Sequence, residues 1–249
     1  MKRKLIYSTI GSFFWLTFLF LCVPLTSAAE PTYLYKVKLV QAAPGKLLEL
    51  IELHKSSLTG YKDAGDEQPL TLRHSQGDRW DLMILIPIKS YEAYYTTERV
   101  AKRRQVLGEV LGRLDALMSW QEDVFVYGPS LSELQAVFAS SAFFHVEMFD
   151  ALAGKGAELF KEREMENAYQ RALKRPENFI FVRDQGAAWD LFTIGAYRDL
   201  KHYAESAGIP ETEQESAAKS AGFESANRIG PYLRTLINLH HDTLAVKVR

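Results

Sequence analysis

Two β-rich segments carry polar side chains that offer groups for acid–base chemistry and for anion binding. Lys36 and Lys38 alternate with apolar residues in one segment, and His145 and Glu147 do so in another. An imidazole titrates near neutral pH and can act as acid, base or ligand, while lysines attract anions. If these faces line a pocket, all four are candidate ligand-binding residues and His145 is also a candidate catalytic residue. Alternatively, the strand ends protrude into solvent, or Lys36 or Lys38 forms an ion pair with Glu147, because unpaired buried charges are costly.

Two Trp-Asp pairs form a second candidate site. Trp80-Asp81 and Trp189-Asp190 could place two indole rings and two carboxylates around one pocket, with the carboxylates sharing a proton. The tryptophans are then candidate ligand-binding residues, and Asp81 and Asp190 are candidate catalytic residues. In the alternative interpretation, each Trp fills the core at the start of a strand and each Asp binds the preceding turn.

The remaining histidines give no metal-ligand spacing. His240 and His241 are adjacent, and neighbours on extended backbone point in opposite directions, so they make a poor chelate. His54 lies on the apolar side of a segment with helical periodicity. A phosphate-binding glycine-rich loop, a nucleophile elbow and an HExxH motif are all absent from the sequence. We therefore predict no metal site.

The chain repeats itself at an offset of about 109 residues. The run 76–82, QGDRWDL, matches the run 185–191, QGAAWDL, and the same register extends without a gap from Tyr35 to Tyr94. Beyond the second helical segment the offset becomes about 119, because the second copy has a longer polar loop near residues 208–213. The Trp-Asp pair occurs in both copies, which favours its structural interpretation.

Each copy shows the same order of predicted elements. In the first copy, strands are expected at 33–40, 70–74, 80–88 and 123–127, and helices at 45–61 and from Ser90 to about Trp120. The order β-α-β-β-α-β is that of a ferredoxin-like unit. Such a unit leaves one sheet face uncovered, and a second copy can cover it. We predict an α+β fold with one repeat at 30–130 and another at 131–249, packed sheet to sheet.

In this element order and duplication, residues 33–249 resemble a tandem member of the dimeric α/β-barrel superfamily. The resemblance implies one pseudo-dimeric barrel built from both repeats, and hence a monomer or weak homodimer. The superfamily includes monooxygenases, isomerases, haem-degrading enzymes, chlorite-dismutase-like haem proteins and stress-responsive barrels, so the fold does not decide function. By resemblance to its haem branch, His54 is a candidate haem ligand; otherwise no cofactor is expected.

The N-terminus has the pattern of a secretory signal peptide. A basic start, an apolar run over residues 10–23 and small residues before position 30 predict a signal segment at 1–29, cleaved after Ala29. An uncleaved anchor and a lipoprotein modified at Cys22 are the alternatives. Cleavage removes the only cysteine and three basic residues, which changes the formal net charge from −1 to −4. We therefore expect a secreted or periplasmic protein with no stable membrane insertion, and the charge balance gives no indication of nucleic-acid binding.

Three functions remain open from the sequence. The first is an exported soluble protein that binds a small planar or anionic molecule inside the barrel. The second is a cofactor-independent monooxygenase or isomerase that acts on an aromatic substrate, with His145 and an Asp as base. The third is a structural or interaction protein whose barrel is fully packed. A cavity, and an imidazole polarised by a carboxylate beside it, would distinguish them.

Overall fold

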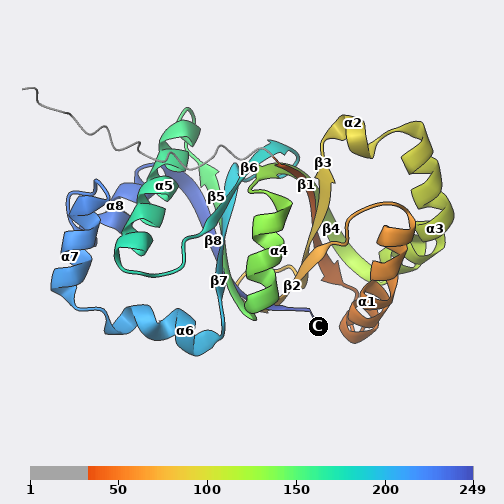
Figure 1. Cartoon of the computed structure of the whole chain (residues 1–249), viewed down its shortest axis with the longest axis horizontal. Helices are drawn as coiled ribbons and strands as arrows, with labels where there is room; N and C mark the ends of the chain where they lie inside the picture. Colours follow the sequence, from red (N-terminus) through yellow and green to blue (C-terminus); the bar gives the residue numbers. More distant parts are fainter. Residues whose placement is uncertain (1–32, 249) are drawn as a thin grey trace, which may run out of the picture.

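Eight strands form a closed barrel in a computed structural model, which describes residues 33–248 (Figure 1). The predicted signal segment and its cleavage site lie outside these described residues. The order of strands around the barrel is β1-β3-β2-β8-β5-β7-β6-β4, and all neighbouring pairs are antiparallel. The strands are β1 (Tyr33–Ala42), β2 (Leu70–Gln76), β3 (Leu82–Lys89), β4 (Met118–Gly128), β5 (Phe143–Ala151), β6 (Phe179–Gln185), β7 (Leu191–Tyr197) and β8 (Ile237–Lys247).

The two repeats have the predicted β-α-β-β-α-β order, so the α+β fold class is confirmed. The helices of the first repeat are α1 (Leu47–Asp63), α2 (Tyr91–Tyr94) and α3 (Thr97–Asp115). Those of the second are α5 (Gly156–Ala172), α6 (Leu200–Ala204), α7 (Glu211–Ser220) and α8 (Ile229–Arg234), with 3₁₀ turns at Glu205–Gly208 and Ala226–Arg228. Pairing of β2 with β8 and of β4 with β6 joins the repeats into one barrel. The helices of each repeat cover opposite sides of it (Figure 1).

One irregularity occurs at equivalent places in both repeats. The register of β1 with β4 shifts between Gln41 and Ala42, and the register of β5 with β8 shifts between Asp150 and Ala151. These positions differ by the offset of 109 that the sequence predicted. The agreement extends the internal duplication from residue types to backbone geometry.

The second helical segment of the first repeat ends earlier than predicted. It divides into α2 and α3, because the Thr96 side chain accepts a hydrogen bond from the backbone N–H of Arg99 and begins a new helix. Helix α3 ends at Asp115, and Trp120 already pairs with Gln41 in the sheet. The prediction of helix up to Trp120 was therefore wrong, because sheet pairing prevails over the helical spacing of the last apolar residues.

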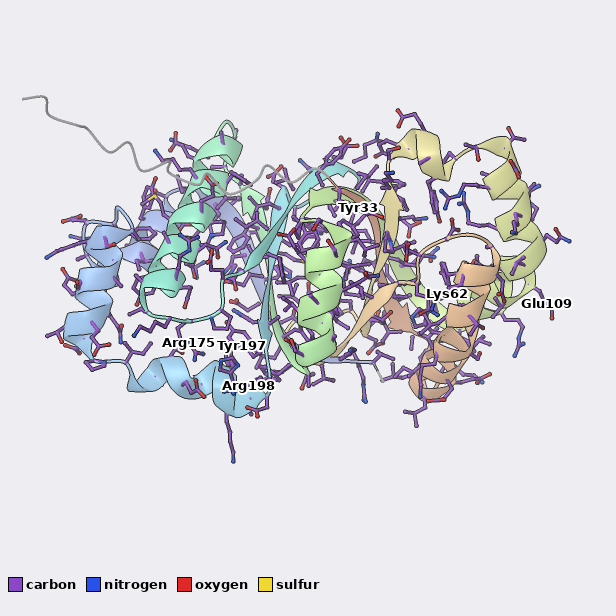
Figure 2. The ribbon with its side chains drawn as sticks, viewed as in Figure 1. Tyr33, Lys62, Glu109, Arg175, Tyr197 and Arg198 are labelled. Atoms are coloured by element: carbon purple, nitrogen blue, oxygen red, sulfur yellow. The ribbon has the colours of Figure 1, made fainter. Side chains whose placement is uncertain are left out.

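Apolar side chains from both repeats fill most of the barrel interior, and the side chains crowd the space between the strands (Figure 2). Tyr35 and Phe144 form one level of this core, Val37 and Val146 the next, and these residues are buried. An eight-stranded barrel is just wide enough for its own side chains to fill it. A ligand inside the barrel is therefore restricted to a cavity that remains at one end.

The polar faces of β1 and β5 point away from the interior. Lys36 and Lys38 lie with residues of α1 and α3, and Glu147 lies near Arg163 of α5. The expectation that Lys36, Lys38, His145 and Glu147 line the interior was therefore wrong. The period of two along each strand is confirmed, but the apolar faces are the ones that meet inside the barrel.

Helix α4 (Leu131–Ser140), which was not predicted from the sequence, lies between the helical layers of the two repeats (Figure 1). Ser130 and Glu133 form a reciprocal capping box at its start. Leu134 and Phe138 are buried in the barrel core, where the ring centroid of Phe138 is 4.7 Å from that of Phe144. Helix α4 therefore packs against the Phe144 end of the interior. Among the helices of residues 33–248, none is long and apolar enough to cross a membrane.

Candidate functional site

A cavity of about 300 Å³ lies at the other end of the barrel, beyond Leu39 and Met148. Its volume is at the lower end of the range for small-molecule sites, roughly 300–1,000 Å³. Both repeats contribute to its wall. The lining residues are Leu39, Asp78, Arg79, Trp80, Trp120 and Glu122 from the first repeat, and Met148, Asp150, Ala188, Trp189, Leu239 and His241 from the second.

Three indole rings border this cavity. Trp80 and Trp189 directly precede the Asp residues that lead into β3 and β7, and both rings are buried. Within the described part of the chain, neither indole N–H has a hydrogen-bond partner. Trp120 comes from β4 and is more exposed. The sequence-predicted residues Trp80 and Trp189 are thus brought together at one cavity.

Asp81 and Asp190 bind backbone instead of lining the cavity. Asp81 Oδ2 accepts a hydrogen bond of 2.8 Å from the N–H of Ala42, and Asp190 Oδ2 accepts one of 2.8 Å from the N–H of Ala151. These N–H groups lie at the two equivalent register shifts. Asp190 also forms an ion pair with Arg183. Each carboxylate therefore holds the end of a strand in its own repeat, and the two do not form a proton-sharing pair.

The repeated glycine of the Trp-Asp motif brings each loop close to the other repeat. Gly77 has φ +126°, and a Cβ there would lie 2.1 Å from the carbonyl oxygen of Asp242 on β8. Gly186 has φ +84°, and its Cβ would lie 2.5 Å from the carbonyl oxygen of Asp123 on β4. Only glycine permits both the backbone conformation and the close approach. This approach places Asp78 beside β8.

Asp78 and His241 form a polar pair at the edge of the cavity. His241 Nδ1 lies 3.1 Å from Asp78 Oδ2, and both residues line the cavity. With Nδ1–H donating to Asp78, Nε2 is the basic atom of the imidazole. The sequence did not identify these residues as a candidate site. Comparison of the copies could have done so, because Ala187 replaces Asp78 in the second repeat and Glu122 stands where the second repeat has His241.

Arg79 and Trp120 complete the polar side of the cavity. The guanidinium of Arg79 lies 4.2 Å from the ring centroid of Trp120, within cation–π distance. Burial raises the pKa of the Glu122 carboxyl, and the charge of Arg79 partly opposes this effect. The cavity wall contains three carboxyl groups, from Asp78, Glu122 and Asp150, and one guanidinium. An added anion is therefore disfavoured there.

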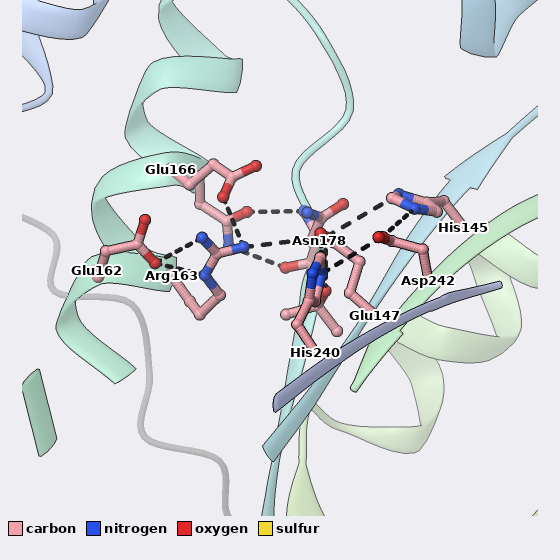
Figure 3. Close-up of polar contacts among 10 residues, drawn as sticks. His145, Glu147, Glu162, Arg163, Glu166, Asn178, His240 and Asp242 are labelled. Atoms are coloured by element: carbon pink, nitrogen blue, oxygen red, sulfur yellow. Dashed lines mark hydrogen bonds and ion pairs between the residues drawn. The ribbon is translucent and has the colours of Figure 1, made fainter. Parts of the chain in front are cut away.

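A second polar cluster lies between the sheet and α5 (Figure 3). It contains His145 and Glu147 of β5 and His240 and Asp242 of β8. The distance from His145 Nε2 to Asp242 Oδ1 is 3.0 Å, and His240 Nε2 lies 3.4 Å from Asp242 Oδ1 and 3.5 Å from Glu147 Oε1. The sequence-predicted residues His145 and Glu147 are therefore neighbours, but they lie outside the barrel interior.

Mutual attraction changes the proton affinity of these four groups. Burial lowers the pKa of His145, but the contacts with Asp242 and Glu147 outweigh it, so the pKa is raised. Contacts with the Asp242 and Glu147 carboxylates raise the pKa of His240 to about 9. The imidazoles in turn hold the pKa of Asp242 below its usual range and lower that of Glu147 against the effect of burial. The cluster therefore favours cationic groups next to its carboxylates.

Arg163 of α5 connects this cluster to two further carboxyl groups (Figure 3). Its guanidinium lies 2.6 Å from Glu166 Oε2, 2.5 Å from Glu162 Oε2 and 3.9 Å from Glu147 Oε2. Arg163 and Glu162 are almost completely buried. Burial raises the pKa of Glu166 to about 7, although Arg163 opposes the shift. Thus one buried guanidinium faces several carboxyl groups.

Lys36 and Lys38 form polar contacts within the first repeat. Lys36 Nζ lies 2.7 Å from Asp123 Oδ2, and Lys38 Nζ donates to Gln121 Oε1 at 2.7 Å. The suggested pairing of either lysine with Glu147 was wrong, because β4 supplies nearer partners on the adjacent strand. These lysines line a cavity of about 120 Å³ between the sheet and helices α1 and α3.

His54 borders the same small cavity, and its surroundings do not fit a haem ligand. Its Nε2 atom lies 2.8 Å from Thr71 Oγ1, and the residue is 2% exposed. Burial lowers the pKa of His54 to about 4. A cavity of about 120 Å³ is below the roughly 300 Å³ of a small-molecule site. The imidazole is therefore a neutral core group bound to a hydroxyl.

Comparisons with known proteins identify the fold. No protein-family model and no curated protein matches the sequence. An anthrone oxidase-like protein of solved structure is 11% identical, with 90% of this chain and 94% of that chain covered and a TM-score of 0.59. Monooxygenase-like proteins from Lactobacillus acidophilus NCFM and Fusobacterium nucleatum subsp. nucleatum are 8% and 11% identical, with TM-scores of 0.53 and 0.55. The matches cover 88% of this chain in both cases, and 95% and 93% of the two structures. The chain shares the fold of these dimeric α/β-barrel-type proteins.

Proposed function

We propose that this protein binds a small, neutral, planar aromatic molecule in the cavity at the barrel end. The observation that carries this proposal is the combination of three indole rings around about 300 Å³ with a polar side that differs between the repeats. Aromatic walls suit a planar ring, and a few convergent polar groups suit its orientation. Alanines replace Asp78 and Arg79 in the second repeat, so the motif has diverged where it faces the cavity.

The charge of the wall restricts the ligand. Three carboxyl groups and one guanidinium in the wall disfavour an anion. Lys36 and Lys38, on which an anionic ligand depended, lie outside this cavity. A neutral phenol or quinone fits these conditions better than an aromatic carboxylate.

Tryptophan fluorescence tests the binding directly. The sequence has four tryptophans, of which Trp80, Trp120 and Trp189 line the cavity and Trp15 lies in the predicted signal segment. We expect 1-naphthol to quench this emission saturably and 1-naphthoate to do so much less. Equal quenching by both would contradict the preference for a neutral ligand, and quenching by neither would contradict binding and favour a purely structural protein.

A second candidate function is supported by the Asp78–His241 pair. With Asp78 holding Nδ1, the Nε2 atom of His241 can accept the hydroxyl proton of a bound phenol, and the carboxylate stabilises the resulting imidazolium. The phenolate is more electron-rich than the phenol and reacts more readily with oxygen. This step fits cofactor-independent oxidation of an aromatic substrate, and the similar folds of oxidase-like and monooxygenase-like proteins support it.

Measurement of oxygen uptake distinguishes this second candidate function from binding alone. We expect the chain to consume oxygen with an electron-rich naphthol in the presence of a chelator, and His241→Asn to abolish the uptake. His240→Gln is the matched control, because it changes the adjacent histidine on the other side of the strand. Binding of naphthol without oxygen uptake would leave the binding function and exclude oxidation of that substrate.

We also propose that the protein is exported with its N-terminal segment removed. The N-terminal pattern supports removal of residues 1–29, which leaves a chain without cysteine. Expression of the full chain in a bacterial host, followed by intact mass measurement of the periplasmic fraction, tests this. A mature protein that begins at Glu30 is expected, whereas an unprocessed chain in the membrane fraction would indicate an anchor instead.

A further inference from the structure

We propose that His145, Glu147, His240 and Asp242 bind one divalent transition-metal ion between the sheet and α5. This site is separate from the aromatic cavity. The four side chains come from two strands whose positions differ by about 97 residues, which is why no spacing along the sequence indicated them.

The strand register places all four groups on one face. Glu147 pairs with Asp242 across β5 and β8, and His145 and His240 occupy positions two residues away on their own strands. Residues two apart on a strand share a face. His241 therefore faces the opposite side, toward the aromatic cavity. The sequence correctly indicated that His240 and His241 cannot chelate one ion together, but His240 has other partners.

The distances between the donor atoms suit a four-coordinate ion. In a tetrahedral site with bonds of roughly 2.0–2.1 Å, neighbouring ligand atoms are about 3.3 Å apart. His145 Nε2 lies 3.0 Å from Asp242 Oδ1, and His240 Nε2 lies 3.4 Å from the same oxygen and 3.5 Å from Glu147 Oε1. Ligand atoms of His145, Glu147 and Asp242 all lie within 4.8 Å of one another. These three residues form the compact part of the site, and His240 becomes the fourth ligand if its side chain rotates toward the ion.

Two further features point to a cation here. His240 Nε2 is buried and has no hydrogen-bond partner among the residues that the structure describes. In addition, the carboxylates of Glu147 and Asp242 both lie beside these imidazoles, and a bound divalent ion would replace the imidazole protons as the positive charge next to them. Buried charge of one sign is costly without such compensation.

The structure also holds two of the ligands in place. Thr193 Oγ1 donates a hydrogen bond of 3.2 Å to Glu147 Oε2, which leaves Oε1 toward His240. The ring of His240 stacks on Phe149 at a centroid distance of 4.9 Å and an interplanar angle of 14°. Supporting contacts of this kind orient metal ligands. Two imidazoles and two carboxylates suit Zn²⁺, Mn²⁺, Fe²⁺ or Co²⁺ better than Mg²⁺ or Ca²⁺, which prefer oxygen ligands alone.

Metal titration tests this site. After chelator treatment and removal of the chelator, the purified chain is titrated with Zn²⁺ by calorimetry and with Co²⁺ by visible absorption. We expect one equivalent of each to bind and Co²⁺ to develop the ligand-field bands of a four-coordinate site. Asp242→Asn and His240→Ala are each expected to weaken Zn²⁺ binding by roughly 100-fold or more, since supporting contacts alone are worth 10–100-fold.

His241→Ala is the matched control, because it removes the neighbouring imidazole from the opposite face. It should bind Zn²⁺ like the unmodified chain. Asp242 is half-exposed, so Asp242→Asn is expected to fold even if His240→Ala does not. Absence of a stoichiometric site, or loss of binding in His241→Ala with binding kept in Asp242→Asn, would overturn the proposal. Naphthol quenching in the same variants reports on the aromatic cavity, so failure of either proposal is recognised separately.

Discussion

His240 and His241 are adjacent on β8, yet their imidazoles lie on opposite sides of the barrel wall. His240 stacks on Phe149 next to the polar cluster under α5, whereas His241 lies 3.1 Å from Asp78 at the aromatic cavity. The alternation of side chains along a strand explains this separation. One strand of the second repeat therefore contributes to two chemically different environments, and single substitutions can separate them.

Replacing Trp120 by leucine tests the aromatic wall without disturbing the core. Leu239 occupies the equivalent position in the second repeat, so Trp120→Leu makes the two sides of the cavity alike. We expect 1-naphthol affinity to fall by about 3–10-fold, since an aromatic contact contributes roughly 0.5–1.5 kcal/mol. Fluorescence titration of the remaining tryptophans measures it.

Trp80→Ala provides the comparison for the effect of Trp120→Leu on the free energy of unfolding. Trp80 is 1% exposed, and truncation should lower the free energy of unfolding by roughly 3–5 kcal/mol. Trp120→Leu, in contrast, should change it by less than about 1 kcal/mol. Unchanged naphthol affinity in Trp120→Leu would show that this ring is not part of the binding wall.

The close approach of the Gly77 loop to β8 predicts a strong effect of a single methyl group. Gly77→Ala should reduce the free energy of unfolding by more than about 2 kcal/mol, because its Cβ would lie 2.1 Å from the Asp242 carbonyl oxygen at φ +126°. It should also move Asp78 away from His241. Urea denaturation measures the stability, and naphthol titration measures the effect on the cavity.

Gly45→Ala separates steric contact from backbone strain. Gly45 also has a positive φ, +75°, but a Cβ at this position would meet no atom within 4 Å. Its substitution should cost only about 1 kcal/mol and leave naphthol binding unchanged. Equal losses for the two variants would show that the approach of the Gly77 loop to β8 has no energetic importance.

Carboxylates at the two register shifts should contribute unequally to stability. Asp81→Ala leaves the Ala42 N–H without its acceptor and should cost about 1–3 kcal/mol. Asp190→Ala removes the equivalent bond to Ala151 and also the ion pair with Arg183, so a larger loss is expected. Urea denaturation of both variants provides the comparison, and a smaller loss for Asp190→Ala would contradict this assignment.

The sequence predicted the fold well because duplication and hydrophobic alternation both depend on local residue order. It predicted Trp80 and Trp189 as neighbours of a cavity for the same reason. It did not indicate which face of β1 lies inside, because Tyr35 and Lys36 alternate identically in either orientation. Only the closure of the barrel makes the apolar face internal.

The Asp78–His241 pair and the four-residue cluster were missed for a different reason. Their members come from different strands and loops, and their proximity depends on the register of β2 with β8 and of β5 with β8. Register between distant strands is set by the assembled barrel. The sequence does contain one indication of the cavity. The two copies differ at positions that face it, such as Asp78 in the first copy and Ala187 in the second.

The buried His54 predicts how acid destabilises the first repeat. Burial lowers its pKa from 6.5 to about 4, so the unfolded chain binds a proton at His54 over this interval and the folded chain does not. Stability is therefore lost as the pH falls from 6.5 toward 4, and at about pH 5 the loss from this group is about 2 kcal/mol. In His54→Gln, the difference in unfolding free energy between about pH 7 and about pH 5 should be smaller by this amount. Urea denaturation at both pH values measures the difference, with His202→Gln as a control for loss of an imidazole. An unchanged pH dependence in His54→Gln would mean that His54 is protonated in the folded protein, and that its contact with Thr71 forms with the cationic ring.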